Sequence, residues 1–162
     1  MSMLDKVYVK KSETADTRTC DVSIVSKEQL LQSSVSHIAD VKRVFNEIAE
    51  YLLVKAELHD CTKLTRMDWF YDDFKTGFAT QGWYDMHRRA ERHHIAHDDG
   101  VPMDVDLFDV LEHLIDNVTA CVARTGNKLS YNYSDLNTEL LKLAVTNTEL
   151  KLLQCVELEA DE

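Results

Sequence analysis

The sequence contains few of the residues that interrupt helices. Among its 162 residues there are only four glycines and one proline. Turn-rich folds depend on these two residue types, so their scarcity favours helices. Hydrophobic residues make up 44% of the chain, and a domain of this length can bury a core without disulfides or a structural metal. We expect an all-α fold of about five to six helices.

Cysteine motifs and long apolar runs are also missing. The four cysteines show no C-x-x-C spacing, which argues against a zinc knuckle and against a disulfide framework. The N-terminal sequence MSMLDKVYVKK has no apolar signal core, and no apolar run approaches the roughly 20 residues that span a bilayer. We therefore expect a soluble, cytoplasmic protein that has no membrane partner.

Positive charge is scarce as well. The chain carries 18 lysines and arginines against 29 aspartates and glutamates, which gives a formal net charge of -11. Binding to DNA or RNA rests on neutralising many phosphates with basic side chains, so a nucleic-acid polymer is not an expected partner. A small phosphorylated ligand needs only a few local cations and stays compatible with this charge. The acidic surface would also suit a basic protein partner.

The spacing of apolar residues predicts where the helices lie. Residues 1–26 alternate weakly and predict a short irregular or β-like arm, in which KVYVKK and CDVSIV would pair. From Ser26 or Lys27 to His59, apolar residues recur at helical spacing and predict one or two long helices. Further helices are expected over residues 65–77, 83–97, 105–124 and 135–153.

Local signals mark several of these helix ends. Thr65 and Asp68 resemble a capping pair, and Gly77 should stop the helix that follows. Asp104 or Asp106 can cap the helix that ends at Thr125-Gly126-Asn127, and Ser134 or Asp135 can start the last one.

We divide the chain accordingly into an arm (1–26), a core (27–127), a C-terminal helix (128–158) and an acidic tail (159–162). The C-terminal helix would pack on the core or form the interface of a homodimer.

Histidines and acids recur along the predicted core in a distinctive order, H…HD…H…HH…D. Imidazole and carboxylate together suit divalent manganese, iron, cobalt, nickel or zinc. A buried carboxylate on an apolar helix face, as expected for the last aspartate, needs such a partner. Glu112 and His113, one turn before that aspartate, are expected in a supporting or surface role. The candidate metal ligands are His37, His59, Asp60, His87, His93, His94 and Asp116.

Helix geometry places conditions on this set. In one straight helix, His37 and His59 would lie about 33 Å apart at roughly 1.5 Å per residue, too far to share a metal. Either a turn within residues 46–51 brings the two imidazoles together, which is the arrangement we expect, or His37 is not a ligand. His87 and His94 are two helical turns apart, so a helix over 83–97 would present both on one face, with His93 pointing away.

In these residues the chain resembles the HD-domain superfamily of metal-dependent phosphohydrolases, over about residues 30–124. The resemblance rests on the segments SHIADV, KAELHDCTKL and WYDMHRRAERHHIAHDDGVPMDVDLFDVLEHLIDNVTA, and it is closest to a group of small uncharacterised phage and bacterial proteins of HD type. It implies an HD-type helical bundle in which the first histidine, the HD pair and the distant aspartate bind metal. For a phage protein, it implies action in the host cytoplasm.

The resemblance also implies roles for cationic residues. In a subfamily that cleaves cyclic dinucleotides, a lysine at the position of Lys63 contacts the scissile phosphate. Arg88 and Arg92 would lie together on a helix as a phosphate clamp, or else pair at the surface with Asp85 or Glu91.

We therefore expect a phosphohydrolase that cleaves a nucleotide or related small phosphoester by means of metal-activated water. One or two metal ions would be present, Asp60 would bridge them if there are two, and Asp60 and Lys63 would be the catalytic residues. Two alternatives stay open. The first is an HD-type non-haem di-iron oxygenase, and the second is a non-catalytic phage protein that binds a host factor.

Overall fold

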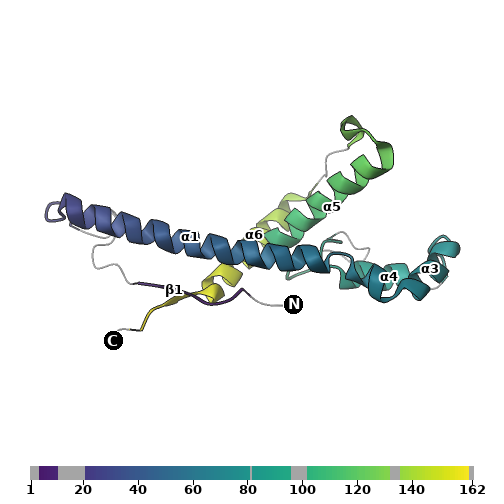
Figure 1. Cartoon of the computed structure of the whole chain (residues 1–162), viewed down its shortest axis with the longest axis horizontal. Helices are drawn as coiled ribbons and strands as arrows, with labels where there is room; N and C mark the ends of the chain where they lie inside the picture. Colours follow the sequence, from purple (N-terminus) through teal and green to yellow (C-terminus); the bar gives the residue numbers. More distant parts are fainter. Residues whose placement is uncertain (1–3, 11–20, 81, 96–101, 132–135, 161–162) are drawn as a thin grey trace. The chain divides into compact units, whose positions relative to one another are not determined.

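The computed structural model describes residues 4–10, 21–80, 82–95, 102–131 and 136–160. These residues form a mostly α-helical protein with a short strand near the N-terminus, as the sequence predicts (Figure 1). None of the described helices combines the length and the apolar character that crossing a membrane requires. The helices are α1 (Lys27–Leu58), α2 (Cys61–Thr65), α3 (Met67–Lys75), α4 (Trp83–Ala90), α5 (Leu107–Thr125) and α6 (Thr138–Cys155), with the 3-10 turn η1 (Lys128–Ser130) and the strands β1 (Val7–Val9) and β2 (Val156–Leu158).

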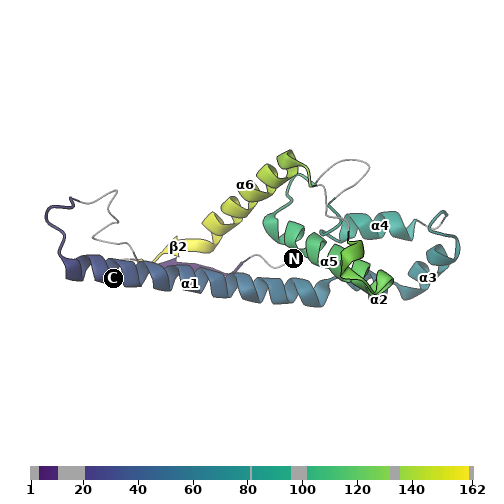
Figure 2. The same cartoon turned by 90° about the horizontal axis from the view of Figure 1, so that it is seen from above.

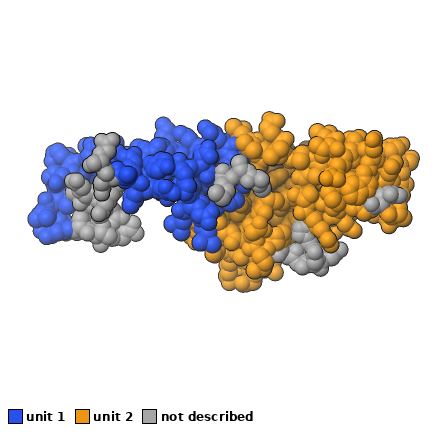
Figure 3. Space-filling model, turned by 90° about the horizontal axis from the view of Figure 1, so that it is seen from below, with its two compact units in different colours: residues 1–52, 150–162 blue, residues 53–149 orange. Residues whose placement is uncertain are grey.

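The chain forms two compact units (Figure 3). The first unit consists of Met1–Leu52 with Leu150–Glu162, and the second of Leu53–Glu149. These limits differ from the segments expected from the sequence, because α1 and α6 each contribute residues to both units.

In the first unit, β1 pairs in parallel with β2, with Val7 opposite Val156. The sequence KVYVKK therefore does contain a strand, but its predicted partner is wrong. Residues of CDVSIV form a turn instead, and the partner strand comes from the other end of the chain, where it directly follows α6 (Figure 2). The N-terminal segment is attached to α1 by the Arg43 side chain, which donates to the Tyr8 carbonyl at 2.9 Å, and by the Asp5 amide, which donates to Glu47 Oε1 at 2.6 Å.

Helix α1 runs unbroken over 32 residues (Figure 2). Its start at Lys27 follows from a reciprocal cap, in which the Ser26 hydroxyl accepts from the Gln29 amide and Gln29 Oε1 accepts from the Ser26 amide. The predicted turn within residues 46–51 is wrong, because the segment NEIAEY contains no residue that interrupts a helix. The helix ends only at Leu58.

The core of the second unit lies where α5 and α6 meet the chain that precedes α5. Five buried residues form it: Ile95, Val105, Val110, Leu140 and Ala144. The first half of α6 thus packs on this core, one of the two roles expected for it. Thr148 strengthens the contact, because its hydroxyl accepts from the amide of Leu107 at 2.8 Å.

The local signals around α5 act as predicted. Asp106 is its N-cap and forms a capping box with Asp109, and Gly126 ends it with a φ of 65°. Helix α6 begins at Thr138, where Asn137 Oδ1 accepts from the Glu139 amide at 2.7 Å. The predicted starts at residues 134 and 135 lie outside the described residues.

Between the HD pair and α5, two predictions about helix ends are wrong. Thr65 does not cap α3 but ends α2, and its hydroxyl donates to the Cys61 carbonyl at 2.9 Å. Gly77, with a φ of 70°, ends the helical conformation after α3 as expected. Helix α4 ends at Ala90 rather than at His97, which lies outside the described residues. The chain leaves the helix at Glu91, whose backbone is extended.

Candidate metal centre

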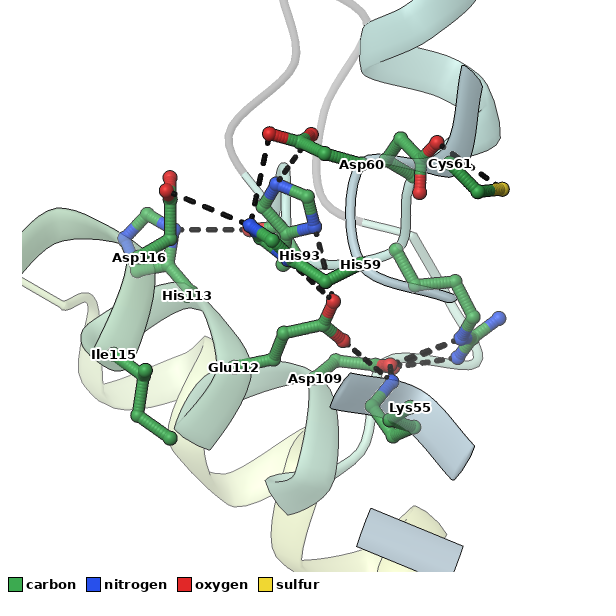
Figure 4. A network of polar contacts seen from close by, with 12 residues as sticks. Lys55, His59, Asp60, Cys61, His93, Asp109, Glu112, His113, Ile115 and Asp116 are labelled. Carbon is green, nitrogen blue, oxygen red and sulfur yellow. Dashed lines mark hydrogen bonds and ion pairs between the residues drawn. The ribbon is translucent and has the colours of Figure 1, made fainter. Parts of the chain in front are cut away.

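Six of the seven candidate ligands gather in the second unit together with Glu112, from four parts of the chain. The turn after α1 carries His59 and Asp60, α4 carries His87, and the turn after α4 carries two more histidines. Helix α5 adds two acids, and Figure 4 shows how the labelled side chains of the two turns and of α5 point toward one another. The residues brought together are His59, Asp60, His87, His93, His94, Glu112 and Asp116.

Asp60 lies at the middle of this cluster. As the residue directly before α2 it adopts a left-handed conformation, with φ 55° and ψ 22°, which aspartate tolerates better than most residues. Its Oδ1 lies 3.3 Å from Nε2 of His87 and 3.6 Å from Nε2 of His93. Its Oδ2 lies 3.6 Å from Nε2 of His59 and contacts the ammonium of Lys63. The two oxygens of one carboxylate thus face two different histidine groups.

Three sets of donor atoms are close enough to share an ion. The first consists of His59, Asp60 and Asp116, and the second of Asp60, His87 and His94. The third consists of His59, His93 and Glu112. Because Asp60 belongs to two of the sets, the arrangement can hold two neighbouring ions with one bridging carboxylate.

Several buried polar atoms in the cluster make no hydrogen bond. They are Asp60 Oδ1 and both ring nitrogens of His93, a residue with only 1% of its surface exposed. A buried polar atom without a partner is costly, and native proteins rarely keep three in one place. Imidazole nitrogen and carboxylate oxygen are ligands for divalent transition metals, so this donor set fits a metal site.

The position of His87 is set by hydrogen bonds behind it. The Thr62 hydroxyl donates to Glu91 Oε1 at 2.6 Å and lies 2.7 Å from Nδ1 of His87. Since that hydroxyl has a single proton, Nδ1 of His87 must be the donor in the second contact. Nε2 of His87 then carries its lone pair toward Asp60 and toward Nε2 of His94, 2.9 Å away.

Burial and neighbouring charges shift the pKa values of three candidate ligands toward the forms that can bind metal. Burial, together with nearby His93 and His87, lowers the pKa of His94 to about 3, and burial also lowers the pKa of His87. Burial would raise the pKa of Asp60, but contacts with Lys63 and with the neighbouring imidazoles outweigh it and lower that pKa. Neutral imidazole and ionised carboxylate are the forms that bind metal.

Glu112 is the residue that sequence reasoning undervalued. Its Oε1 lies 3.0 Å from Nδ1 of His59 and 3.2 Å from Nδ1 of His93. Burial opposes its ionisation, but contacts with His93, Lys55 and His59 prevail and lower its pKa to about 2. The available signal was its place one turn before Asp116 on the same helix. The neighbouring His113 supports the turn after α4, since its Nδ1 lies 2.9 Å from the His93 carbonyl.

The prediction that His87 and His94 share one helical face, with His93 pointing away, is wrong, although all three residues reach the cluster. His93 and His94 lie beyond the end of α4, so they do not share a helical face with His87. The turn over residues 91–95 brings His94 to His87 and buries His93 against His59, with ring centroids 4.4 Å apart. Tertiary contacts form this turn, since Glu91 binds the amide of Thr62 at 3.0 Å.

His37 does not join the cluster. It is exposed on α1, and the unbroken helix separates it from His59 by roughly 33 Å at 1.5 Å per residue. The expectation that His37 is a ligand depended on the turn that the helix lacks, so within one chain the site must be drawn without it.

The cationic residues divide into two groups. Lys63 lies at the cluster and contacts Asp60 Oδ2, three residues before it in the sequence. The predicted helical pair of Arg88 and Arg92 is wrong, because α4 ends between them. Arg92 binds Asp109 through two nitrogens and Asp104 at 2.7 Å, which raises the pKa of an arginine that burial alone would lower. Arg88 lies over the Tyr84 ring, 5.6 Å from its centroid.

Comparisons of the chain with protein-family models, with curated proteins and with solved structures give no match.

Proposed function

We propose that this protein is a metal-dependent phosphohydrolase of HD type that acts on a nucleotide or related small phosphoester. The observation that carries the proposal is the position of Asp60, whose two carboxylate oxygens face separate histidine groups within 3.6 Å. The unpartnered buried nitrogens of His93 support it, because a metal ion would be their natural partner.

Two ligand groups would hold the ions. His59, Asp60 and Asp116 form one, and Asp60, His87 and His94 form the other, with His93 beside them. Divalent manganese, iron, cobalt, nickel or zinc bound there would lower the pKa of water and stabilise negative charge on a phosphate.

The residues of the chain itself supply positioning and charge. Thr62 and Glu91 hold the His87 ring with its Nε2 lone pair toward Asp60. Lys63 places an ammonium beside the carboxylate at the centre, where a phosphate would bring further negative charge. Arg92 is bound to two aspartates, so we leave it out of substrate binding.

The test is a phosphate-release screen with the purified full-length chain. Nucleoside mono-, di- and triphosphates and cyclic nucleotides would be offered with manganese, cobalt or nickel. We expect metal-dependent release that Asp60→Asn abolishes. The matched control is His37→Asn, which removes an exposed histidine outside the cluster and should retain activity.

Two results would contradict the proposal. One is that none of the metals supports phosphate release, and the other is phosphate release that Asp60→Asn leaves intact. Oxygen consumption by the iron-loaded protein without phosphate release would instead support the oxygenase alternative.

A further inference from the structure

Glu112 faces two of the imidazoles from the side opposite to Asp60. Its Oε1 lies 3.0 Å from Nδ1 of His59 and 3.2 Å from Nδ1 of His93. The Nε2 atoms of the same two rings each lie 3.6 Å from an Asp60 oxygen. Each ring therefore has Glu112 on one nitrogen and Asp60 on the other, as Figure 4 shows.

The distances on the two sides differ in kind. The contact of 3.0 Å between Glu112 Oε1 and Nδ1 of His59 is a hydrogen bond. The distances from Nε2 of His59, 3.6 Å to Asp60 Oδ2 and 3.7 Å to Asp116 Oδ1, are too long for one. Donor atoms that surround a tetrahedral ion at about 2.1 Å lie about 3.4 Å from one another. The Nε2 side thus has the spacing of ligands that share an ion, and the Nδ1 side has the spacing of a hydrogen bond.

Glu112 is itself held in place by a buried ammonium. Its Oε2 lies 2.8 Å from Nζ of Lys55, a residue with only 5% of its surface exposed. Lys55 also donates to Asp109 at 3.0 Å, and Asp109 in turn accepts from Arg92 and from the backbone amide of Asp106. A carboxylate fixed in this way cannot turn its Oε2 toward an ion without leaving a buried lysine partly unpaired.

We propose that Glu112 is a positioning residue and not a metal ligand, an inference that rests on the proposed metal centre. Held by Lys55, it accepts a hydrogen bond from Nδ1 of His59 and presents negative charge to Nδ1 of His93. A neutral imidazole has one N–H, so protonation at Nδ1 leaves the lone pair on Nε2, which faces Asp60. His59 is the ring held most directly, because Nδ1 of His93 lies near Oε1 without the alignment of a hydrogen bond.

The opposite assignment makes a different prediction. If Glu112, His59 and His93 were one ligand set, both rings would bind the ion through Nδ1 and carry their protons on Nε2. The protonated nitrogen of His59 in the metal-free protein therefore separates the two assignments.

The experiment is a long-range 15N–1H NMR spectrum of the metal-free full-length protein at about pH 9, where an imidazole is neutral and carries one N–H. We expect His59 to be protonated at Nδ1 and not at Nε2 in the wild type. Glu112→Ala should lose this preference and become a mixture of both forms. In Asp116→Asn, a matched control that removes a carboxylate from the Nε2 side, the Nδ1 proton should remain.

Zinc titrations provide the second readout. Removing a carboxylate that orients a ligand histidine weakens metal binding by about 10- to 100-fold, so Glu112→Ala should weaken zinc binding by that factor. Glu112→Gln, which keeps one acceptor oxygen, should lose less.

Protonation of His59 at Nε2 in the metal-free wild type would overturn the inference, and so would zinc bound through Nδ1. If Glu112→Ala does not fold, the wild-type spectrum still decides. Failure of the wild type to bind any metal would contradict the proposed function, while the NMR result would still test the role of Glu112.

Discussion

Acidification should destabilise the metal-free protein, with His94 as a main contributor. Burial, together with His93 and His87, lowers the pKa of His94 from 6.5 to about 3 in the folded state. The unfolded chain takes up a proton as the pH falls through about 6.5, and the folded chain does not do so until about pH 3. The stability that comes from this difference is therefore fully present above pH 6.5 and is lost as the pH falls toward 3.

The magnitude follows from the linkage between proton binding and folding. One pKa unit corresponds to about 1.4 kcal/mol, and about pH 5 lies about 1.5 units below the pKa of an unfolded histidine. The full effect would be about 2 kcal/mol. Partial solvent contact of His94 screens the interaction, so we expect a loss of about 1 to 2 kcal/mol between neutral pH and about pH 5. His87, whose pKa is also lowered, changes stability in the same direction.

The assay is urea unfolding, followed by circular dichroism with a chelator present, at neutral pH and at about pH 5. His94→Gln should reduce the loss on acidification, whereas His37→Gln, which alters an exposed residue of α1, should retain the wild-type loss. A wild-type free energy of unfolding that does not fall between the two conditions would refute the reasoning. An equal loss in wild type and His94→Gln would also refute it.

Three further predictions concern single residues. Lys55→Met should lower the free energy of unfolding, measured in urea titrations, by about 3 to 5 kcal/mol, because it leaves Glu112 and Asp109 without a buried ammonium. A change under about 1 kcal/mol would contradict the buried ion pairs of Lys55. Lys63→Met should slow phosphate release without reducing bound metal, measured by turnover and metal analysis on one preparation, and an unchanged rate would remove Lys63 from the reaction. His37→Ala should keep the wild-type metal content, and loss of the metal would show that His37 is a ligand after all.

Elements with local signals could be predicted from the sequence. The start of α5 follows from a capping aspartate three residues before a second acid, and its end from a glycine that reaches positive φ. The start of α1 follows from the reciprocal pairing of Ser26 and Gln29. In these cases residues within one turn of the helix end make the contacts that determine it.

Elements that depend on distant contacts could not be predicted in this way. Helix α4 has a helical pattern beyond Ala90, yet it ends there while Glu91 binds Thr62 and Arg92 binds Asp109. The same turn brings His93 into the cluster, although helical spacing would point it away. The role of Glu112 was equally hidden, because its partners Lys55, His59 and His93 lie far from it in the sequence.

The candidate site was predictable in its membership more than in its geometry. Six of the seven expected ligands meet in the second unit. They were chosen because imidazole and carboxylate bind metal, and that choice does not depend on where each helix ends. The position of His37 was predicted wrongly, because reaching the cluster required a turn that no residue of the segment NEIAEY encodes.

Whether the cluster around Asp60 binds metal can be decided by metal analysis of the purified full-length protein, compared with the Asp60→Ala variant. We expect one or two divalent transition-metal ions per wild-type chain, and their loss in Asp60→Ala with helical content unchanged. A wild-type protein that binds no such ion, or an Asp60→Ala variant that retains the full metal content, would contradict this expectation.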